Sequence, residues 1–124
     1  MNGLDWVHWN GQLVPAEDAS VSVFDAGFLY GDGLYETMRT YSGQVFAFDQ
    51  HAARIARGAD AIDLTIPATE TLRGAVEELL AARRLDSAVV RITVTRGRLD
   101  RRLDLSSAGA PSVPCSAGAV AKLW

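Results

Sequence analysis

Few side chains of this sequence could carry covalent chemistry, because its basic residues are eleven arginines and a single lysine, Lys122. A lysine amine can form a Schiff base with an aldehyde cofactor, whereas arginine stays protonated and cannot. Lysine-dependent covalent chemistry within these residues would therefore have to use Lys122. No chemical motif surrounds that lysine, and we predict no catalytic residue in the chain.

A run of alternating polar side chains follows a glycine-rich turn at residues 27–33. Residues 34–41 are rich in aromatic and branched side chains and predict a strand. One face of that strand would carry Tyr35, Thr37, Arg39 and Tyr41. Such a face is unusually polar for a core and would suit an anionic ligand. The plainer interpretation is a tight turn followed by one strand of a hairpin.

Arginines elsewhere in the sequence each admit two interpretations. Arg54, on the first predicted helix, is either a solvated residue or a phosphate ligand, since a guanidinium can bind two phosphate oxygens at once. The arginines at positions 96, 98, 101 and 102 follow the last predicted strand. They form either a solvated loop interleaved with aspartates or a site for a substrate carboxylate. Arg91, within that strand, is partly buried by the pattern and would need an anionic partner.

The composition argues against several other functions. The 124 residues are 48% hydrophobic and 22% charged, the balance of one ordinary globular domain. A net charge of −3 makes a nucleic-acid partner unexpected, and no apolar run approaches the roughly 20 residues of a membrane span. The N-terminus lacks a signal-peptide pattern, so the expected compartment is the cytoplasm. Cys115, His8 and His51 are too few soft ligands for a metal cluster.

The elements that must position these residues begin with two predicted hairpins. Residues 6–9 and 12–14 flank Asn10-Gly11, the pair that a type I′ turn prefers. Residues 21–24 are expected to add a short strand. The strand over 34–41 turns at Ser42-Gly43 and returns over 44–48. The segment 27–33 between them is too dense in glycine to lie inside a stable element.

Two helices and a further strand follow the hairpins. Asp49 is a suitable N-cap for a helix whose apolar residues recur through Ile62, although Gly58 weakens that helix by about 1 kcal/mol. A second helix opens at Thr69 and continues its apolar stripe through Leu80. Residues 88–95 predict a strand with one apolar face. This order indicates an α+β domain, a mainly antiparallel sheet with two helices packed on one face.

The last stretch, residues 105–124, is rich in small residues and interrupted by Pro111 and Pro114. A strand beginning at Ser112-Val113 would be confined to an edge or ended by Pro114. We therefore expect a domain over residues 1–104 and a poorly packed tail over residues 105–124.

Several of these segments together resemble the N-terminal part of the class IV aminotransferases, which are fold type IV enzymes dependent on pyridoxal 5′-phosphate. The segments are Asn10-Gly11, residues 19–25, residues 27–39, residues 51–55, and residues 89–95 followed by Arg96-Gly97. This family includes D-amino-acid aminotransferases, branched-chain aminotransferases and aminodeoxychorismate lyases. The resemblance covers residues 5–104, and the joint spacing of the segments is what makes it specific.

The resemblance implies roles for six residues. Arg54 corresponds to the arginine that holds the cofactor phosphate in the family. The residues that match or lie near positions of the family's substrate pocket are Tyr30, Tyr35, Arg39, Arg91 and Arg101. D-amino-acid aminotransferases carry a histidine two residues after the last of these, whereas this chain has Leu103.

The family further implies amino acid and 2-oxo acid substrates and a homodimer whose pockets are built partly across the subunit interface. Its cofactor-binding lysine lies beyond residue 124, and the departure of residues 105–124 from the family is what a truncated or frameshifted gene product would show. The chain is thus expected to be the N-terminal half of an aminotransferase, inactive alone. Three alternatives stay open: a lyase-like enzyme that eliminates pyruvate, a non-catalytic phosphate- or carboxylate-binding module, and a dimerisation module.

We expect the 124-residue chain to have no transaminase activity, because no lysine in it matches the family. Incubation with pyridoxal phosphate and reduction with borohydride should leave no stoichiometric adduct at a single residue, as measured by mass spectrometry. Modification of Lys122 alone, together with turnover of an amino acid, would contradict this expectation.

Overall fold

The computed structural model describes residues 6–84, 86–99 and 117–122, the last segment for its backbone alone. The elements in chain order are β1 (Trp6–Trp9), β2 (Gln12–Pro15), the 3₁₀ helix η1 (Ala16–Asp18), α1 (Ala26–Tyr30), β3 (Gly33–Tyr41), β4 (Gln44–Val45), α2 (Phe48–Ala61), α3 (Thr69–Arg83), β5 (Val89–Thr95) and β6 (Ala117–Lys122).

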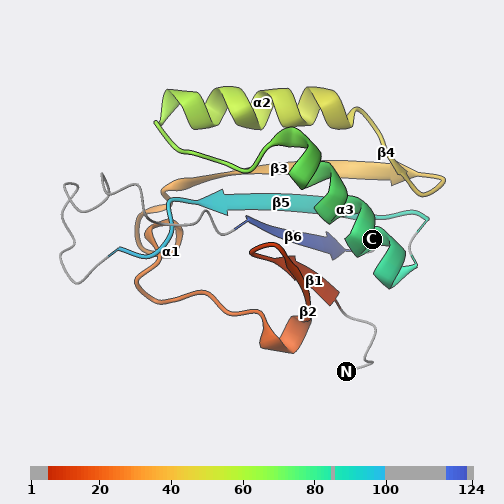
Figure 1. The fold of residues 1–124 in the computed structure, drawn as a ribbon, viewed down its shortest axis with the longest axis horizontal. Helices are drawn as coiled ribbons and strands as arrows, with labels where there is room; N and C mark the ends of the chain where they lie inside the picture. The colour runs from red at the N-terminus through yellow and green to blue at the C-terminus, as the bar shows by residue number, and fades with distance from the viewer. Residues whose placement is uncertain (1–5, 85, 100–116, 123–124) are drawn as a thin grey trace.

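These strands form one six-stranded sheet in the order β2-β1-β6-β5-β3-β4, with α2 and α3 packed on it and α1 at one end (Figure 1). Each pairing between the described strands is antiparallel. The predicted fold class, an α+β domain with helices on one face of an antiparallel sheet, is confirmed. The first predicted hairpin is confirmed too, with positive φ at both Asn10 and Gly11.

An apolar layer between the sheet and the helices forms the core. The alternating residues of β3 and β5 that face the helices, Met38, Val90 and Val94 among them, are almost fully buried. The helices cover them with the side chains Ala52, Ile55, Ala59, Leu72, Val76 and Leu80. Full burial of one branched apolar side chain stabilises a fold by roughly 1.5–3 kcal/mol. This layer therefore fixes the helices on one face, while most side chains on the other face of β3 and β5 stay exposed.

Gly58 of α2 lies against the side chain of Leu34 in β3. A Cβ atom on Gly58 would lie 3.2 Å from Cδ2 of Leu34. The glycine that weakens the helix locally therefore allows it to lie close to the strand.

Residues 21–24 do not form the predicted strand. They enter a turn in which the Asp25 amide donates to the Ser22 carbonyl at 3.0 Å. The Asp25 carboxylate then caps α1 by accepting hydrogen bonds from the amides of Gly27 and Phe28. The glycine-rich stretch thus contains a short helix, contrary to the prediction, because the cap satisfies amides that a helix start leaves free. Gly31 ends it with a left-handed φ of 66°.

The hairpin that follows β3 is shorter than predicted. β4 spans only Gln44–Val45, and α2 begins at Phe48 after Ala47 adopts a left-handed φ of 59°. Phe48 is buried in the core, so its packing at the helix start prevails over continuation of the strand. Asp49 lies in the first turn rather than at the N-cap, and its carboxylate forms an ion pair with Arg73 of α3.

The strand β6 is not predicted by the sequence pattern. It lies between β1 and β5 and pairs with both. Alanine and glycine have little strand preference, so pairing on both edges places this segment in the sheet. The strand expected at Ser112-Val113 lies outside the described residues, and the domain boundary at residue 104 stays a prediction.

Large apolar side chains are exposed around α1 and on the open face of the sheet. The most exposed are Phe28, Phe46, Val23, Tyr35 and Tyr30. Exposed apolar surface of this kind commonly marks an interface. Among the helices of the described residues, none is long and apolar enough to cross a membrane.

We expect the chain to self-associate through this surface. Sedimentation velocity at several concentrations should show an average mass that rises with concentration. Phe28→Asp places a charge in the patch and should shift the distribution toward the monomer. Arg57→Asp, on the exposed side of α2, is the control and should change nothing. A monomer at the highest soluble concentration would contradict the expectation.

Candidate active site

An acidic side chain lies beneath α2 on the helix-covered face of the sheet. Glu36 of β3 is only 5% exposed. Arg54 of α2 donates two hydrogen bonds to it, from Nε to Oε1 at 2.6 Å and from Nη2 to Oε2 at 2.8 Å. Nδ1 of His51 lies 2.7 Å from the same Oε2. Both carboxylate oxygens are therefore held by side chains of one helix.

The electrostatics of this cluster keep Glu36 ionised. The hydrogen bonds from Arg54 hold the pKa of the Glu36 carboxyl below its ordinary value, against the raising effect of burial, and His51 adds to the lowering. The same hydrogen bonds raise the pKa of Arg54. Charge-assisted, two-pronged hydrogen bonds of this kind are roughly twice as strong as those between neutral groups.

Glu36 occupies only one edge of the Arg54 guanidinium. The side chain of Arg54 is 66% exposed, and the edge that Glu36 occupies carries the Nε and Nη2 hydrogens. Nη1 makes no hydrogen bond within the described residues. Arg54 contacts β3, the strand that carries Tyr35 and Arg39. The contact is made on the opposite face from those two residues.

The open face of β3 and β5 gathers three of the predicted substrate residues. Tyr35, Arg39 and Arg91 are all exposed there, and β3 residue Thr37 is directly opposite Arg91 in the sheet register. The Arg91 guanidinium lies 4.0 Å from the centre of the Tyr35 ring, and its Nε donates to Thr93 Oγ1 at 3.3 Å. Arg91 is therefore not partly buried as predicted, because no described helix covers this face.

The other predicted residues lie elsewhere. Tyr30 ends α1 and is 59% exposed. Arg101 lies outside the described residues. Arg54 is separated from the open-face residues by the sheet itself.

Among the described strands, β4 pairs with β3 only at Thr40 and Tyr41, which leaves the outer edge of residues 34–38 unpaired. The two faces of the sheet meet along this unpaired edge.

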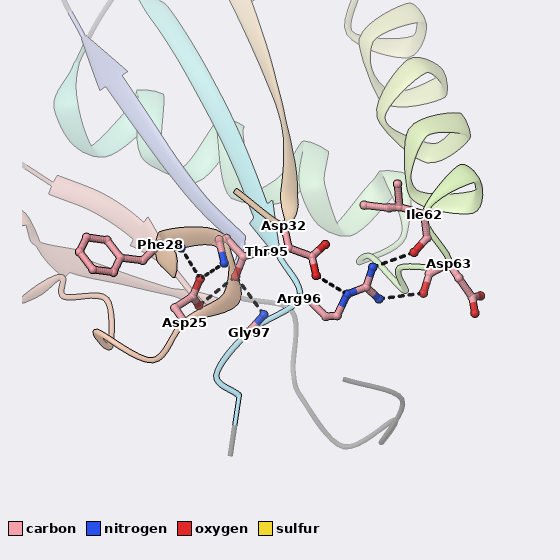
Figure 2. Close-up of polar contacts among 9 residues, drawn as sticks. Asp25, Phe28, Asp32, Ile62, Asp63, Thr95, Arg96 and Gly97 are labelled. Atoms are coloured by element: carbon pink, nitrogen blue, oxygen red, sulfur yellow. Dashed lines mark hydrogen bonds and ion pairs between the residues drawn. The ribbon is translucent and has the colours of Figure 1, made fainter. Parts of the chain in front are cut away.

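The ends of β3, β5 and α1 are joined by polar contacts, which Figure 2 shows. The Thr95 hydroxyl donates to Oδ2 of Asp25 at 2.9 Å and accepts a hydrogen bond from the Gly97 amide at 3.1 Å. The cap of α1 is thereby bound to the end of β5. A Cβ atom on Gly27 would lie 2.4 Å from the Thr95 side chain, so this junction requires glycine there.

Arg96 joins a third element to the same region. Its Nε donates to Asp32 at 2.7 Å, and its Nη2 and Nη1 donate to the carbonyls of Ile62 and Asp63 at the end of α2 (Figure 2). Arg96 is thus neither a solvated loop residue nor an open carboxylate site, the two interpretations of its arginine cluster. Arg98 lies over the Phe24 ring at 5.9 Å.

Reasoning from the sequence missed Glu36 and His51. The sequence contained a signal for Glu36, because this residue shares with Met38 the face of the strand opposite Tyr35. An acidic side chain on a buried face needs a cationic partner. His51 and Arg54 are three residues apart and so share one side of a helix.

In the described part of the chain, no group of three metal-ligating side chains is arranged to hold a metal ion. A hollow of about 700 Å³ lies between β4 and α3, lined by Gln44, Arg73, Glu77 and Arg84 among others. Neither Glu36 nor Arg54 lines it.

The chain is similar in sequence to members of one enzyme family. The family model for amino-transferase class IV matches residues 33–121. A provisionally named branched-chain-amino-acid aminotransferase of Methanocaldococcus jannaschii is 41% identical over 112 residues, which are 90% of this chain and 39% of that protein. A D-alanine aminotransferase of Listeria monocytogenes is 42% identical over 71% of this chain and 31% of its own length. The chain thus spans less than two fifths of these relatives.

Solved structures of similar fold cover nearly the whole chain. The branched-chain amino acid aminotransferase of Escherichia coli has a TM-score of 0.85 at 22% identity, over 97% of this chain and 41% of its own. A second branched-chain amino acid aminotransferase, solved in complex with N-(5′-phosphopyridoxyl)-L-glutamate, has a TM-score of 0.84 at 26% identity, over 97% and 41%. That of Thermoproteus uzoniensis, solved with norvaline, has a TM-score of 0.82 at 27% identity over the same shares.

The contacts of Glu36 with Arg54 and His51 should stabilise the fold in a way that depends on pH. The folded pKa of Glu36 lies below the unfolded value of about 4.3, so this contribution is complete above that value and is lost as the pH falls through the folded pKa. Glu36→Gln should lower the free energy of unfolding at pH 7 by about 1–3 kcal/mol. The gap from wild type should narrow as the pH falls below about 4.3 and close below the folded pKa of Glu36. Urea denaturation across this pH range measures it, with exposed Glu17→Gln as control. A gap independent of pH would contradict the prediction.

Proposed function

Because the chain belongs to the class IV aminotransferase family, we propose that it forms the N-terminal part of a pyridoxal-phosphate-dependent aminotransferase, and that its Arg54 binds the cofactor phosphate. The complete enzyme would transfer an amino group between an amino acid and a 2-oxo acid. The observation that carries the proposal is the guanidinium of Arg54, held by Glu36 on one edge and open on the other.

The donors present fit a phosphate group. The Nη1 and Nη2 hydrogens on the open edge of Arg54 form the fork that binds two oxygens of one phosphate. The side chain is exposed enough for a ligand to reach it. Glu36 cancels part of the positive charge, but a dianion approaching the open edge meets the cation first and the carboxylate behind it.

Pyridoxal phosphate, when bound, supplies the electron sink for amino-group transfer. The chain would contribute phosphate binding and orientation and leave the cofactor's covalent attachment to a lysine outside these 124 residues. The relative solved with phosphopyridoxyl-glutamate supports pyridoxal phosphate as the cofactor. The relatives' names support amino transfer over the lyase alternative.

The open face of the sheet would serve the substrate. Tyr35, Arg39 and Arg91 offer two cations and an aromatic ring. This set suits a substrate that has a carboxylate and an apolar side chain. Tyr30 and Arg101 keep the substrate-pocket roles that the resemblance implies. A ligand bound along the unpaired edge of β3 could reach Arg54 on one face and Tyr35 on the other. The exposed aromatic surface supports a homodimer.

Arg54→Ala should weaken binding of pyridoxal phosphate roughly ten- to a hundredfold, because it removes a charge-assisted, two-pronged contact. Arg54→Lys should recover only part of the affinity, since an ammonium cannot span two phosphate oxygens. The measurement is the cofactor dissociation constant in the chain joined to the C-terminal part of a class IV aminotransferase.

Arg57, exposed on the same helix three residues later, is the matched control for this series. Arg57→Ala should leave the affinity close to that of the parent. Equal affinities for the parent and Arg54→Ala would return Arg54 to the role of a solvated helix arginine.

A further inference from the structure

We infer that Glu36 is a positioning residue that fixes the guanidinium of Arg54 with its open edge toward the cofactor phosphate, and that His51 holds the Glu36 carboxylate in place for this. The inference rests on the proposed function of Arg54. It adds two residues of this chain to the cofactor site.

The geometry of the pair decides the direction of the open edge. A guanidinium is rigid and planar, so fixing the Nε and Nη2 edge against Glu36 also fixes where the Nη1 and Nη2 edge points. Glu36 is suited to this because it is itself immobile. It projects from the long strand β3, is 5% exposed, and has both oxygens engaged.

His51 completes the arrangement from the same helix. Its Nδ1 shares Oε2 of Glu36 with Nη2 of Arg54, so the carboxylate is held at two points rather than one. His51 is only partly exposed, and its side chain lies beside the apolar residues Met38, Ile55 and Leu72. The ring is therefore packed, and it limits rotation of the carboxylate.

Positioning matters here because Arg54 is otherwise a long side chain at the surface of a helix. Its four rotatable bonds would leave the guanidinium in many orientations, and ordering them on ligand binding would weaken the binding constant by roughly tenfold. Glu36 orders the side chain before the ligand arrives. Its negative charge acts in the opposite direction, by repelling the phosphate. Water at the exposed edge screens that repulsion, so we expect the positioning effect to be the larger.

Glu36→Asp separates the two effects, because it keeps the charge and withdraws the carboxylate by one methylene. In the chain joined to a class IV C-terminal part, Glu36→Asp should weaken pyridoxal phosphate binding about tenfold and leave binding of pyridoxal, which lacks the phosphate, unchanged. Glu36→Gln should weaken pyridoxal phosphate binding less, because loss of repulsion offsets part of the loss of order. His51→Leu should act in the same direction as Glu36→Asp, and His51→Asn, which retains a donor near the Nδ1 position, should restore most of the affinity.

Two controls distinguish a phosphate-specific role from a general loss of structure. Asp49→Asn removes a carboxylate that pairs with another helix arginine, Arg73, and should affect neither ligand. In the Arg54→Ala background, Glu36→Asp should have no further effect on pyridoxal phosphate, because no guanidinium is left to position.

The possible outcomes separate this inference from the proposed function. If Arg54→Ala weakens phosphate-dependent binding and Glu36→Asp does not, the inference is wrong and the proposed function stands. Tighter binding in Glu36→Gln with unchanged binding in Glu36→Asp would mean that Glu36 acts through charge alone, which also overturns the inference. Equal weakening for pyridoxal and pyridoxal phosphate would assign Glu36 to structure only. No effect of Arg54→Ala would overturn both proposals.

A measurement on the 124-residue chain tests the positioning directly. With ¹⁵N-labelled arginine, the Nε–H of Arg54 should exchange with water at least tenfold more slowly than that of Arg57, because it is hydrogen-bonded to a buried carboxylate. Glu36→Asp should remove that difference. Equal exchange at Arg54 and Arg57 in the wild type would show that Glu36 does not hold Arg54 in solution.

Discussion

The carboxylate of Glu36, buried between a strand and a helix, is the constraint around which this part of the molecule is arranged. It shares the covered face of β3 with Met38 and Thr40, where an unpaired charge would be strongly unfavourable. α2 supplies both of its partners, His51 and Arg54, from positions three residues apart. Apolar contacts hold one side of α2 on the sheet. The ion pair adds a directional contact to them, because side chains of α2 bind both oxygens of the Glu36 carboxylate.

The candidate binding residues lie on the two faces of β3. Arg54 approaches β3 from the covered face, whereas Tyr35, Arg39 and Arg91 lie on the open face. The two faces of the sheet adjoin at the outer edge of β3, which among the described residues β4 leaves unpaired at positions 34–38. Because side chains alternate along a strand, the adjacent residues Tyr35 and Glu36 lie on opposite faces, and Glu36 is the one that binds Arg54. In the proposed enzyme, Arg54 would bind the cofactor phosphate from the covered face, and the residues of the open face would bind the substrate.

The end of the sheet near this edge is held by contacts between distant parts of the chain. Arg96 bonds to Asp32, 64 residues earlier, and to the carbonyls that end α2. Thr95 bonds to Asp25, 70 residues earlier. These contacts explain how a glycine-rich segment that is weak by local preference becomes well defined. Gly27 lacks the side chain that would collide with Thr95, and Asp25 satisfies the amides of the short helix that follows.

The sequence by itself determined the features that depend on local periodicity. Alternation over residues 34–41 and 88–95 identified β3 and β5, helical spacing identified α2 and α3, and Asn10-Gly11 identified the first hairpin. The spacing of motifs also identified the family. Tertiary structure alone decided the place of β6, the start of α2 at Phe48, the structural use of Arg96 and the partner of Arg54. Each of these depends on a residue outside the local sequence window, such as Glu36, 18 positions from Arg54. A local pattern carries no information about which distant group will satisfy a charge, a backbone amide or an unpaired strand edge.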